Sequence, residues 1–373
     1  RKLLYLSQGR LRLANARTGK ARTVEVPLRY RPQVRTGRQV VHAGRFWDGQ
    51  ARKLRRNVDI TVVDNRIRSI TPHRRHRSGR VVDASGLTVM PGLMDSHVHQ
   101  AYESRFFGDR QGRVSLAWGI TSTLSVGDQV YRAMEDRDAL RAGARVGPRF
   151  YATGEPVDGS RVYYNFMRPT RSDAQVRREL TRARRLDYDF VKSYVRLQAT
   201  RMAMVVSAAH ALGVPSSSHY LTPGALVGQD GTTHLAATQR LGYAHTLTPT
   251  GHSYDDVPTL YGRGNRTVTT TLFTTDFLTA GELAGDRRLR LLPPWKRESL
   301  LESTADNTAE PSDPDCSSAE CMEARTLLRI HRAGGQVLVG TDSPLDNVAI
   351  GVHANLQEMV GYGWSPYAAL RAA

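Results

Sequence analysis

The sequence predicts an α/β protein whose largest part is a distorted TIM-type (β/α)8 barrel, preceded by a small N-terminal β-sandwich and a β-propeller remnant. Three observations predict this organisation. Residues 92–373 alternate short apolar runs with helical patterns, residues 35–91 hold β-type runs with turn signals, and residues 1–34 show the spacing of one propeller blade. The 373 residues suffice for one large core and a smaller unit.

Short alternating runs separated by turns fill residues 1–34. The runs are Lys2–Leu6, Arg10–Leu13 and Thr23–Val26, with the turn Thr18-Gly19-Lys20 between the last two. A single blade cannot bury its faces alone. We therefore expect this segment to be the tail of a larger upstream domain, and the chain to be a fragment.

Three further β-type runs lie in residues 35–91, at Val40–Phe46, Val58–Ile67 and Val81–Asp83. The second run contains Asp64-Asn65-Arg66, which predicts a hairpin turn because Asp and Asn adopt turn conformations at low cost. We expect these strands to form the small β-sandwich.

The pattern changes after Pro91-Gly92 to strands that alternate with helices. The helical pattern Val176–Leu186, for example, precedes the apolar run Phe190–Val195. Helices of about 10 to 15 residues between apolar strands indicate βα units and a parallel sheet. Over residues 92–373 this favours a barrel. Because the chain ends within the helical pattern Pro366–Ala373, we expect the barrel to be incomplete at its C-terminus.

The chain is strongly basic, with 53 Lys and Arg against 35 Asp and Glu and a formal net charge of +18. Clustered cations attract polyanions, but these arginines are spread from Arg1 to Arg371 and lie near no nucleic-acid-binding motif. We expect a solvated basic surface and a small-molecule substrate, with no nucleic-acid partner. No apolar run reaches 18 residues, so no membrane span is expected. The sequence leaves open whether the chain forms a homo-oligomer.

Two cysteines, Cys316 and Cys321, lie in and just beyond the polar stretch Glu310–Glu320. They could close a small disulfide in an exported protein or stay free in the cytosol. The sequence leaves both alternatives open. The propeller-like N-terminal segment favours an exported or periplasmic location.

Lysine is rare in this arginine-rich chain, and one of the five lysines is in an unusual place. Lys192 lies inside the apolar run Phe190–Val195, where an unpaired charge is costly to bury. We therefore expect Lys192 to have a chemical function.

Histidines and an aspartate follow several of the expected strands. In His97-Val98-His99, side chains two residues apart face the same way, so both imidazoles could share one metal. His219, His234 and Asp342 each follow another short strand. Each residue alone also fits a hydrogen-bonded loop position. In a TIM-type barrel, however, the carboxyl ends of the strands meet at one mouth, so together with the buried lysine they predict a first-row metal site.

These segments resemble the motifs of the amidohydrolase superfamily. Val89–His99 is similar to its first-strand signature and Val339–Ser343 to its last-strand aspartate motif. The intermediate segments that agree are Asp189–Arg196, Ser218–Tyr220 and Gly231–Leu235. The resemblance covers about residues 38–373. It is closest to the dipeptidase-like and imidazolonepropionase-like barrels that follow a TolB-like propeller.

The resemblance implies a ligand set for two divalent metal ions, with zinc as the first choice. His97 and His99 would hold the more buried ion with Asp342, His219 and His234 would hold the second, and Lys192 would bridge both. The bridging lysine of this family is carboxylated. Only lysine can present the neutral amine that carboxylation requires, because its pKa falls on burial whereas arginine keeps its charge.

The resemblance also implies the reaction. A hydroxide that bridges the two metals would cleave the C–N bond of an amide, a cyclic amide or a dipeptide. Asp342 would be the catalytic residue that takes the proton of the attacking water and passes it to the leaving group.

The sequence departs from the family pattern in two places. Tyr220 stands after the third histidine, where relatives often have an acidic or small residue. His245 and His252 compete with His234 for the fourth histidine position. We favour His234 because it ends a short apolar stretch, whereas the other two lie in a loop rich in Thr and Gly.

Four residues near the expected mouth are predicted to bind substrate: Tyr102, Tyr194, Arg196 and Tyr220. The guanidinium of Arg196 could hold a substrate carboxylate through two hydrogen bonds. All four also fit surface or supporting positions.

Two other functions stay open from the sequence. The same metal centre would serve a lactone, ester or phosphotriester hydrolase, since fold does not fix substrate. The alternative that is not an enzyme is a catalytically inert binding protein.

Overall fold

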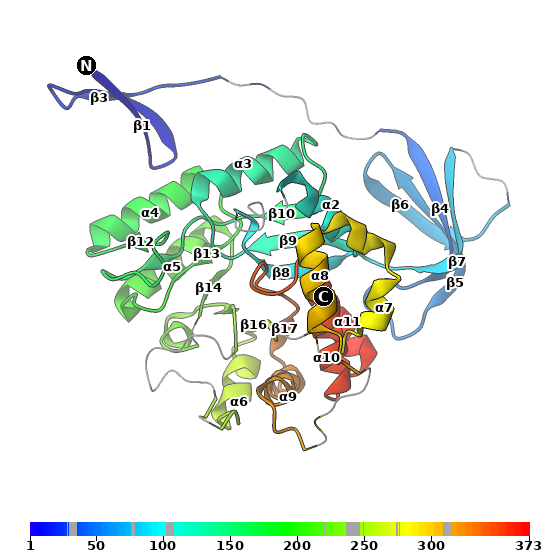
Figure 1. Cartoon of the computed structure of the whole chain (residues 1–373). Helices are drawn as coiled ribbons and strands as arrows, with labels where there is room; N and C mark the ends of the chain where they lie inside the picture. The colour runs from blue at the N-terminus through cyan, green and yellow to red at the C-terminus, as the bar shows by residue number, and fades with distance from the viewer. Residues whose placement is uncertain are drawn as a thin grey trace.

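The fold is mixed α/β, with a separate N-terminal antiparallel sheet, a four-stranded sheet and a larger α/β body (Figure 1). The computed structural model describes residues 1–373 except 28, 30–35, 76–78, 102–107, 220, 236–246, 249, 274, 276, 309–312 and 314.

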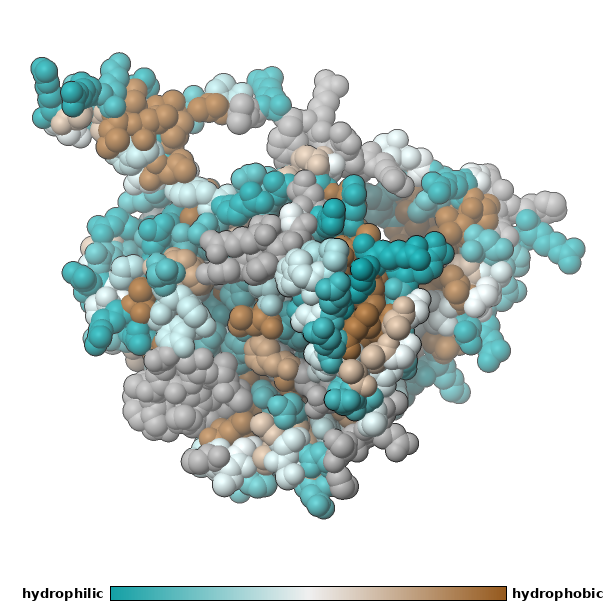
Figure 2. All heavy atoms as spheres, in the orientation of Figure 1, coloured by the Kyte–Doolittle hydropathy of each residue, from teal (hydrophilic) through white to brown (hydrophobic). Residues whose placement is uncertain are grey.

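The first three strands form an antiparallel sheet of their own, made of β1 (Lys2–Ser7), β2 (Arg10–Asn15) and β3 (Ala21–Thr23). Its apolar side chains are largely in water, and Figure 2 shows them as a brown patch over this sheet. The sheet contacts the body through Arg185 Nη1, which donates to the carbonyl oxygen of Gln8 at 3.2 Å. That it is the tail of a propeller stays a prediction.

The second sheet has the strand order β6-β5-β4-β7. Its strands are β4 (Arg38–Phe46), β5 (Arg55–Val63), β6 (Arg66–Pro72) and β7 (Arg80–Val89). β5 and β6 form the expected hairpin, with Asp64 in the turn at a positive φ of 55°. The core of this sheet centres on Ala43, Phe46, Val58 and Ile60. The second layer that a sandwich needs stays a prediction.

The body contains two larger parallel sheets, with eight strands between them among the described residues. One sheet holds β8 (Leu93–Val98), β9 (Ile120–Ser125) and β10 (Arg149–Tyr151), and the other holds β13 (Val191–Lys192), β14 (Ser216–Ser218), β15 (Gly231–Thr232), β16 (Thr267–Thr269) and β17 (Gln336–Leu338). A short pair, β11 (Val157–Asp158) and β12 (Arg168–Pro169), lies beside them.

Backbone hydrogen bonds join the two parallel sheets at both edges. Asp189 N donates to the carbonyl oxygen of Ala152 just after β10, and Ser96 N on β8 donates to that of Val339 just after β17. The strands therefore follow one another around a ring, as in a TIM-type fold. Among the described residues no continuous ladder closes this ring, so the expected barrel is present as two parallel sheets.

Helices follow most of the parallel strands, as the alternating pattern predicts. They are α2 (Gln111–Ala117), α3 (Val130–Arg141), α4 (Asp173–Arg185), α5 (Ala199–Leu212), α6 (Asp256–Arg263), α7 (Ala280–Ala284), α8 (Pro294–Ser303), α9 (Ala319–Arg332), α10 (Ile350–Gly361) and α11 (Pro366–Ala372), with 3-10 turns η1 (Gly108–Arg110), η2 (Gly224–Val227) and η4 (Arg287–Leu291). Side-chain caps determine where several of these helices begin. Ser172 caps α4 and Ser318 caps α9, each side chain accepting from a backbone N–H three residues on.

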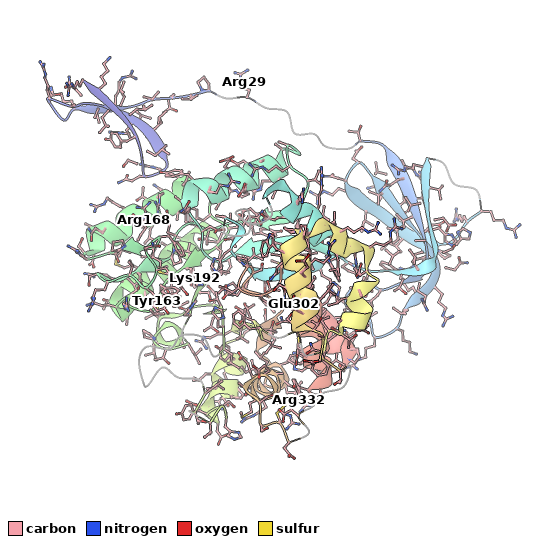
Figure 3. The ribbon with its side chains drawn as sticks, in the orientation of Figure 1. Arg29, Tyr163, Arg168, Lys192, Glu302 and Arg332 are labelled. Atoms are coloured by element: carbon pink, nitrogen blue, oxygen red, sulfur yellow. A yellow bond between two sulfur atoms is a disulfide. The ribbon has the colours of Figure 1, made fainter. Side chains whose placement is uncertain are left out.

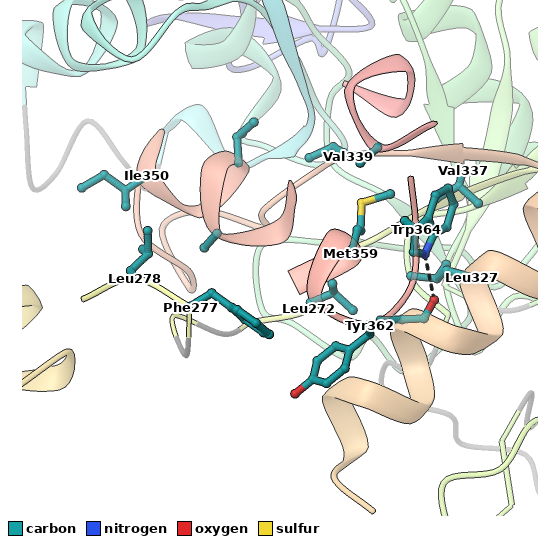
Figure 4. Close-up of a cluster of buried hydrophobic side chains, with 14 of the residues drawn as sticks. Leu272, Phe277, Leu278, Leu327, Val337, Val339, Ile350, Met359, Tyr362 and Trp364 are labelled. Carbon is teal, nitrogen blue, oxygen red and sulfur yellow. Dashed lines mark hydrogen bonds between the residues drawn. The ribbon is translucent and has the colours of Figure 1, made fainter. Parts of the chain in front are cut away.

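The largest apolar core lies where α9 and α10 pack against the strands near β17 (Figure 4). Leu327, Val337 and Met359 meet there and are all buried. The indole N–H of Trp364 donates to the carbonyl oxygen of Ala324 at 3.0 Å, so its polar atom has a partner inside the core. Each large side chain buried here contributes about 1.5–3 kcal/mol of transfer free energy, which fixes the position of the strand that leads to Asp342.

The two cysteines are paired. Cys316 and Cys321 form a disulfide with their Cα atoms 5.3 Å apart, just before and within the first turn of α9. Of the two alternatives that the sequence left open, the structure has the disulfide.

Within the described part of the chain, no helix is both long and apolar enough to cross a membrane.

Candidate metal centre

The centre is built where β8 and the segment after β17 run side by side. Asp342 N donates to the carbonyl oxygen of His97 at 2.8 Å. The approach requires a glycine, because a Cβ on Gly340 would lie 2.8 Å from the backbone nitrogen of His97. Asp342 itself has a φ of 57°, a left-handed conformation that non-glycine residues adopt only at a cost. Backbone strain of this kind gathers at functional sites.

Two histidine lone pairs point at one carboxylate oxygen. Nδ1 of His97 lies 2.9 Å from the carbonyl oxygen of Thr233, and Nδ1 of His99 lies 2.5 Å from that of Gly127. Because a carbonyl oxygen only accepts, each Nδ1 carries a hydrogen, and in the neutral form of each ring the lone pair is on Nε2. Burial lowers the pKa of His97; it acts the same way on His99, but there the carboxylate of Asp342 outweighs it and raises the pKa. Both Nε2 atoms lie 3.0 Å from Asp342 Oδ1.

This convergence fits a bound cation. Nε2 of His97 and Oδ1 of Asp342 are buried and have no hydrogen-bond partner among the described residues. Lone pairs and a carboxylate oxygen brought this close repel one another unless a positive charge lies between them. A donor set of imidazole and carboxylate suits zinc and neighbouring first-row metals.

His234 joins the same group from the end of β15. Its Nε2 lies 3.6 Å from Asp342 Oδ2, and its ring centroid lies 4.6 Å from that of His97. One ligand atom from each of these three residues lies within 4.8 Å of the others. Nδ1 of His234 is 2.8 Å from the hydroxyl of Thr271, which holds the ring orientation.

Lys192 is buried on β13 at the same end of the strands (Figure 3). Burial lowers the pKa of its amine from 10.5 to about 7, although the nearby carboxylate of Asp342 favours the charged form. A lysine with such a pKa presents a neutral amine far more readily than one in water. A neutral amine is what carboxylation of Lys192 would require.

His219 faces the same cavity but has other partners. Its Nε2 lies 2.7 Å from the hydroxyl of Tyr194, and its Nδ1 lies 3.3 Å from that of Thr233. Its ring centroid is 4.6 Å from that of His234. Ligation by His219 Nε2 would therefore replace its hydrogen bond to Tyr194.

The charges of the centre are strongly coupled. Burial raises the pKa of Asp342, but the rings of His97 and His99 outweigh this and hold it well below its usual value. Burial lowers the pKa of His219 and His234 well below the usual value, with Lys192 adding to the effect. The site therefore holds Asp342 as a carboxylate and these two rings neutral, which are the forms that bind metals.

A cavity of about 180 Å³ opens beside these residues. Four of its lining residues are ionisable, namely His99, Lys192, His219 and Asp342, and the others are Pro156, Tyr164, Phe166, Met167, Tyr194, Pro344 and Leu345. The lining thus combines ionisable groups with apolar and aromatic ones. Such a site can hold a small substrate by an apolar group and expose a polar bond to the metal ligands.

Comparison with known proteins agrees with this architecture. A Xaa-Pro dipeptidase with bound methionine in its active site is 18% identical, with a TM-score of 0.66 over 90% of this chain and 87% of that chain. A putative prolidase from Bifidobacterium longum is 20% identical, with a TM-score of 0.65 over 91% and 82%. An amidohydrolase is 18% identical, with a TM-score of 0.64 over 90% and 85%. The chain has the fold of the amidohydrolase superfamily.

A curated relative matches a smaller part of this chain. A dihydroorotase from Solibacter usitatus (strain Ellin6076) is 34% identical over 86 residues, which are 22% of this chain and 20% of the dihydroorotase. No protein-family model matches the chain. The resemblance to the superfamily drawn from the sequence motifs is thus confirmed at the level of the fold.

The amidohydrolase fold brings the six expected metal ligands to one end of the strands. His97, His99 and His234 surround the carboxylate of Asp342, while Lys192 and His219 line the cavity beside it. Their roles as ligands stay predictions. His252 is exposed and lines a different cavity next to Cys316, and His245 lies outside the described residues.

The four expected substrate-binding residues are placed differently. Tyr194 lines the cavity. Arg196 is exposed, is not among the residues that line the cavity, and its Nη1 donates to the carbonyl oxygen of Val162 at 2.7 Å, so its role as a carboxylate clamp stays a prediction. Tyr102 and Tyr220 lie outside the described residues.

Two buried carboxylates support the centre and were missed by the sequence reasoning. Asp95 accepts from Thr341 N at 3.1 Å and from its hydroxyl at 2.7 Å, and Asp128 accepts from the hydroxyl of Ser125 at 2.7 Å. Burial raises the pKa of Asp95 to about 7 and that of Asp128 to about 6. Asp95 had a signal, because it stands two residues before His97 and so shares its face of the strand. The sequence offered no comparable signal for Asp128, which lies in a loop.

Proposed function

We propose that this chain is a metal-dependent hydrolase that cleaves the C–N bond of an amide, a cyclic amide or a dipeptide. The observation that carries the proposal is the convergence of the His97 and His99 lone pairs on Asp342 Oδ1, both at 3.0 Å. The names of the similar structures, which include dipeptidase, prolidase and amidohydrolase, support it. The match to a dihydroorotase is consistent with cyclic amides as substrates.

The donor set divides into two groups around the shared carboxylate. His97, His99 and Asp342 would hold one divalent cation, with zinc preferred by the imidazole ligands. His219, His234 and Lys192, carboxylated on its amine, would hold the second. Bound there, the cations would supply a Lewis acid for the scissile carbonyl and lower the pKa of water.

Asp342 is suited to carry the proton of the reaction. Its low pKa keeps it a carboxylate at neutral pH, so it can accept a proton at a carboxylate oxygen from the attacking water. The same oxygen then returns the proton to the leaving nitrogen, which departs as a neutral amine. Its position among three imidazoles keeps the carboxylate in one place through both transfers.

Lys192 is suited to become the anionic bridge. The amine is buried beside Asp342 in the cavity wall, where a permanent ammonium is unfavourable. Attack of the neutral amine on carbon dioxide forms one N–C bond and releases one proton to solvent. The product is a carbamate with two oxygen ligands in place of a cation.

The cavity indicates a small substrate with an apolar group. Its wall includes Tyr164, Phe166 and Met167 in addition to the expected metal ligands. Burial strongly raises the pKa of Tyr194, so its hydroxyl stays protonated and can donate a hydrogen bond to the substrate carbonyl. We therefore place the scissile carbonyl near Tyr194 and an apolar side group against the aromatic wall.

A substrate panel tests the proposal. The chain, loaded with zinc in bicarbonate buffer, is assayed with Xaa-Pro and other dipeptides, N-acyl amino acids, cyclic amides, lactones and phosphotriesters. We expect cleavage of a C–N bond in at least one of the first three classes. The activity should be about 10²–10⁴-fold lower in Asp342→Asn and retained in Asp255→Asn, a change of an exposed carboxylate. Cleavage of lactones or phosphotriesters alone would favour the alternative hydrolase. A fully loaded chain that cleaves nothing would favour an inert binding protein.

We also propose an exported or periplasmic location. The disulfide between Cys316 and Cys321 supports it, because disulfides persist mainly in oxidising compartments. Fractionation of cells that express the natural gene tests this, and recovery of the chain with reduced thiols in the cytosol would contradict it.

A further inference from the structure

Asp95 connects the two segments that carry the first candidate metal ligands. It lies on β8, two residues before His97, and is 2% exposed. Its Oδ1 accepts from the backbone N–H of His97 at 3.2 Å and from that of Thr341 at 3.1 Å. Its Oδ2 accepts from the hydroxyl of Thr341 at 2.7 Å. One buried carboxylate therefore joins the strand that carries His97 to the segment that carries Asp342.

The hydroxyl of Thr341 extends this connection to the far side of Asp342. It donates to Asp95 Oδ2 and accepts from the backbone N–H of Ser343 at 3.0 Å. A hydroxyl group has one hydrogen to donate and two lone pairs to accept with, so it can make both bonds at once. The residues before and after Asp342 are thus held to the same carboxylate, Thr341 directly and Ser343 through the hydroxyl.

The backbone of Asp342 needs such a restraint. Its φ of 57° is a left-handed conformation, and a non-glycine residue keeps it only where the surrounding structure determines it. Backbone hydrogen bonds set the spacing of the two segments, because Asp342 N donates to the carbonyl oxygen of His97 and His99 N to that of Ser343, both at 2.8 Å. A residue in a strand conformation could donate the same bond. The hydrogen bonds of Thr341 on either side therefore help to select the left-handed conformation.

The left-handed conformation decides where the Asp342 side chain points. Its Oδ1 lies 3.0 Å from Nε2 of His97 and from Nε2 of His99, and its Oδ2 lies 3.6 Å from Nε2 of His234. A change of the backbone at Asp342 would move the carboxylate away from these rings. Because the groups that orient metal ligands contribute to metal affinity, the connection through Asp95 should affect the affinity of the centre.

The charge of Asp95 also suits a neighbouring cation. The three hydrogen bonds that its carboxylate accepts come from neutral groups, two backbone N–H groups and one hydroxyl. A buried carboxylate with neutral partners alone is costly. A divalent cation held by His97, His99 and Asp342 would place positive charge near it and reduce this cost.

We propose that Asp95 is a positioning residue of the candidate metal centre, which holds the segment 341–343 so that the Asp342 carboxylate meets the imidazoles of His97 and His99. The inference rests on the proposed function, because it concerns the ion that these side chains would bind. Asp95 is not one of the proposed ligands. It acts through Thr341, and its loss should weaken metal binding in a chain that still folds.

Zinc affinity in competition with a chromogenic chelator tests the proposal. Asp95→Asn keeps an oxygen for the two N–H groups, but its NH₂ group cannot accept from the hydroxyl of Thr341. We expect it to bind at least one zinc about 10–100-fold more weakly than the wild type. Asp59→Asn is the matched control, since Asp59 is a buried carboxylate of the four-stranded sheet that accepts from Arg74 N at 2.9 Å. It should keep the wild-type affinity. Wild-type affinity in folded Asp95→Asn would overturn the proposal.

A second pair of variants keeps the test decisive if Asp95→Asn does not fold. Thr341→Val keeps the size of the side chain but removes the hydroxyl that links Asp95 to Ser343, whereas Thr341→Ser retains it. We expect zinc to bind about 10–100-fold more weakly to Thr341→Val and Thr341→Ser to recover most of the wild-type affinity. Equal affinities of the two variants would overturn the proposal.

A failure of the proposed function gives a different result. A wild type that binds no zinc would refute the metal centre and, with it, the role of Asp95. A wild type that binds zinc as tightly as Asp95→Asn would refute the positioning role alone, because the measurement does not use hydrolase activity.

Discussion

Lys192→Met removes the buried amine of the candidate metal centre and replaces it with an apolar side chain of similar length. In the metal-free chain without bicarbonate, the pKa of Lys192 is lowered by burial from 10.5 to about 7. At 1.36 kcal/mol per unit of pKa shift, this difference means that the charged amine destabilises the folded chain by about 5 kcal/mol. We therefore expect Lys192→Met to be more stable than the wild type at neutral pH when both are free of metal.

The sign of the pH dependence follows from the same shift. The folded chain has the lower pKa, so between about pH 7 and 10.5 the unfolded chain binds more protons. The free energy of unfolding of the wild type should rise with pH through this window, by up to about 1.4 kcal/mol per pH unit. Below pH 7 the destabilisation is fully present, and above pH 10.5 it disappears.

Urea unfolding between pH 6.5 and about 10 measures this difference. The stability of the wild type relative to Lys192→Met should climb across the series, whereas Lys53→Met, which changes an exposed lysine, should follow the wild type. Parallel curves for the wild type and Lys192→Met would refute the reasoning, because they would mean that the amine is not desolvated. With zinc and bicarbonate present the order should reverse, since the variant cannot form the bridge.

Three further changes probe the centre and its support. Asp342→Asn should lower kcat by about 10²–10⁴-fold in steady-state assays with little loss of folding, because it removes the proton carrier; unchanged kcat would exclude that role. Gly340→Ala should cost about 1–3 kcal/mol in urea unfolding and reduce zinc content, because its Cβ would lie 2.8 Å from the backbone of His97; wild-type stability would contradict the close approach. Leu327→Ala, in the core under β17, should cost about 2–5 kcal/mol in the same assay, and a loss below 1 kcal/mol would show that the site is not tightly packed.

The sequence predicted the metal ligands better than their partners. His97 and His99 were recognisable because strand residues two apart share a face, and Asp342 because it follows a short apolar strand. Their meeting could be expected from barrel topology alone, since the carboxyl ends of parallel strands converge. These rules depend on local pattern and topology, both of which one sequence contains.

Contacts between distant segments were beyond the same reasoning. The pairing of His219 with Tyr194, and of Arg196 with the carbonyl oxygen of Val162, depends on loop conformations that no local pattern encodes. The stacking of the His42 ring on the His73 ring was also missed, because strand register decides which side chains meet and a single sequence leaves register open.

The most direct test of the central claim is a crystal structure of the zinc- and bicarbonate-loaded chain with data at the zinc absorption edge. We expect two anomalous peaks about 3.5–4 Å apart, one within bonding distance of His97 and His99 and both in contact with a carboxylated Lys192. Crystals that contain zinc elsewhere but show no peak between His97 and Asp342 would contradict it.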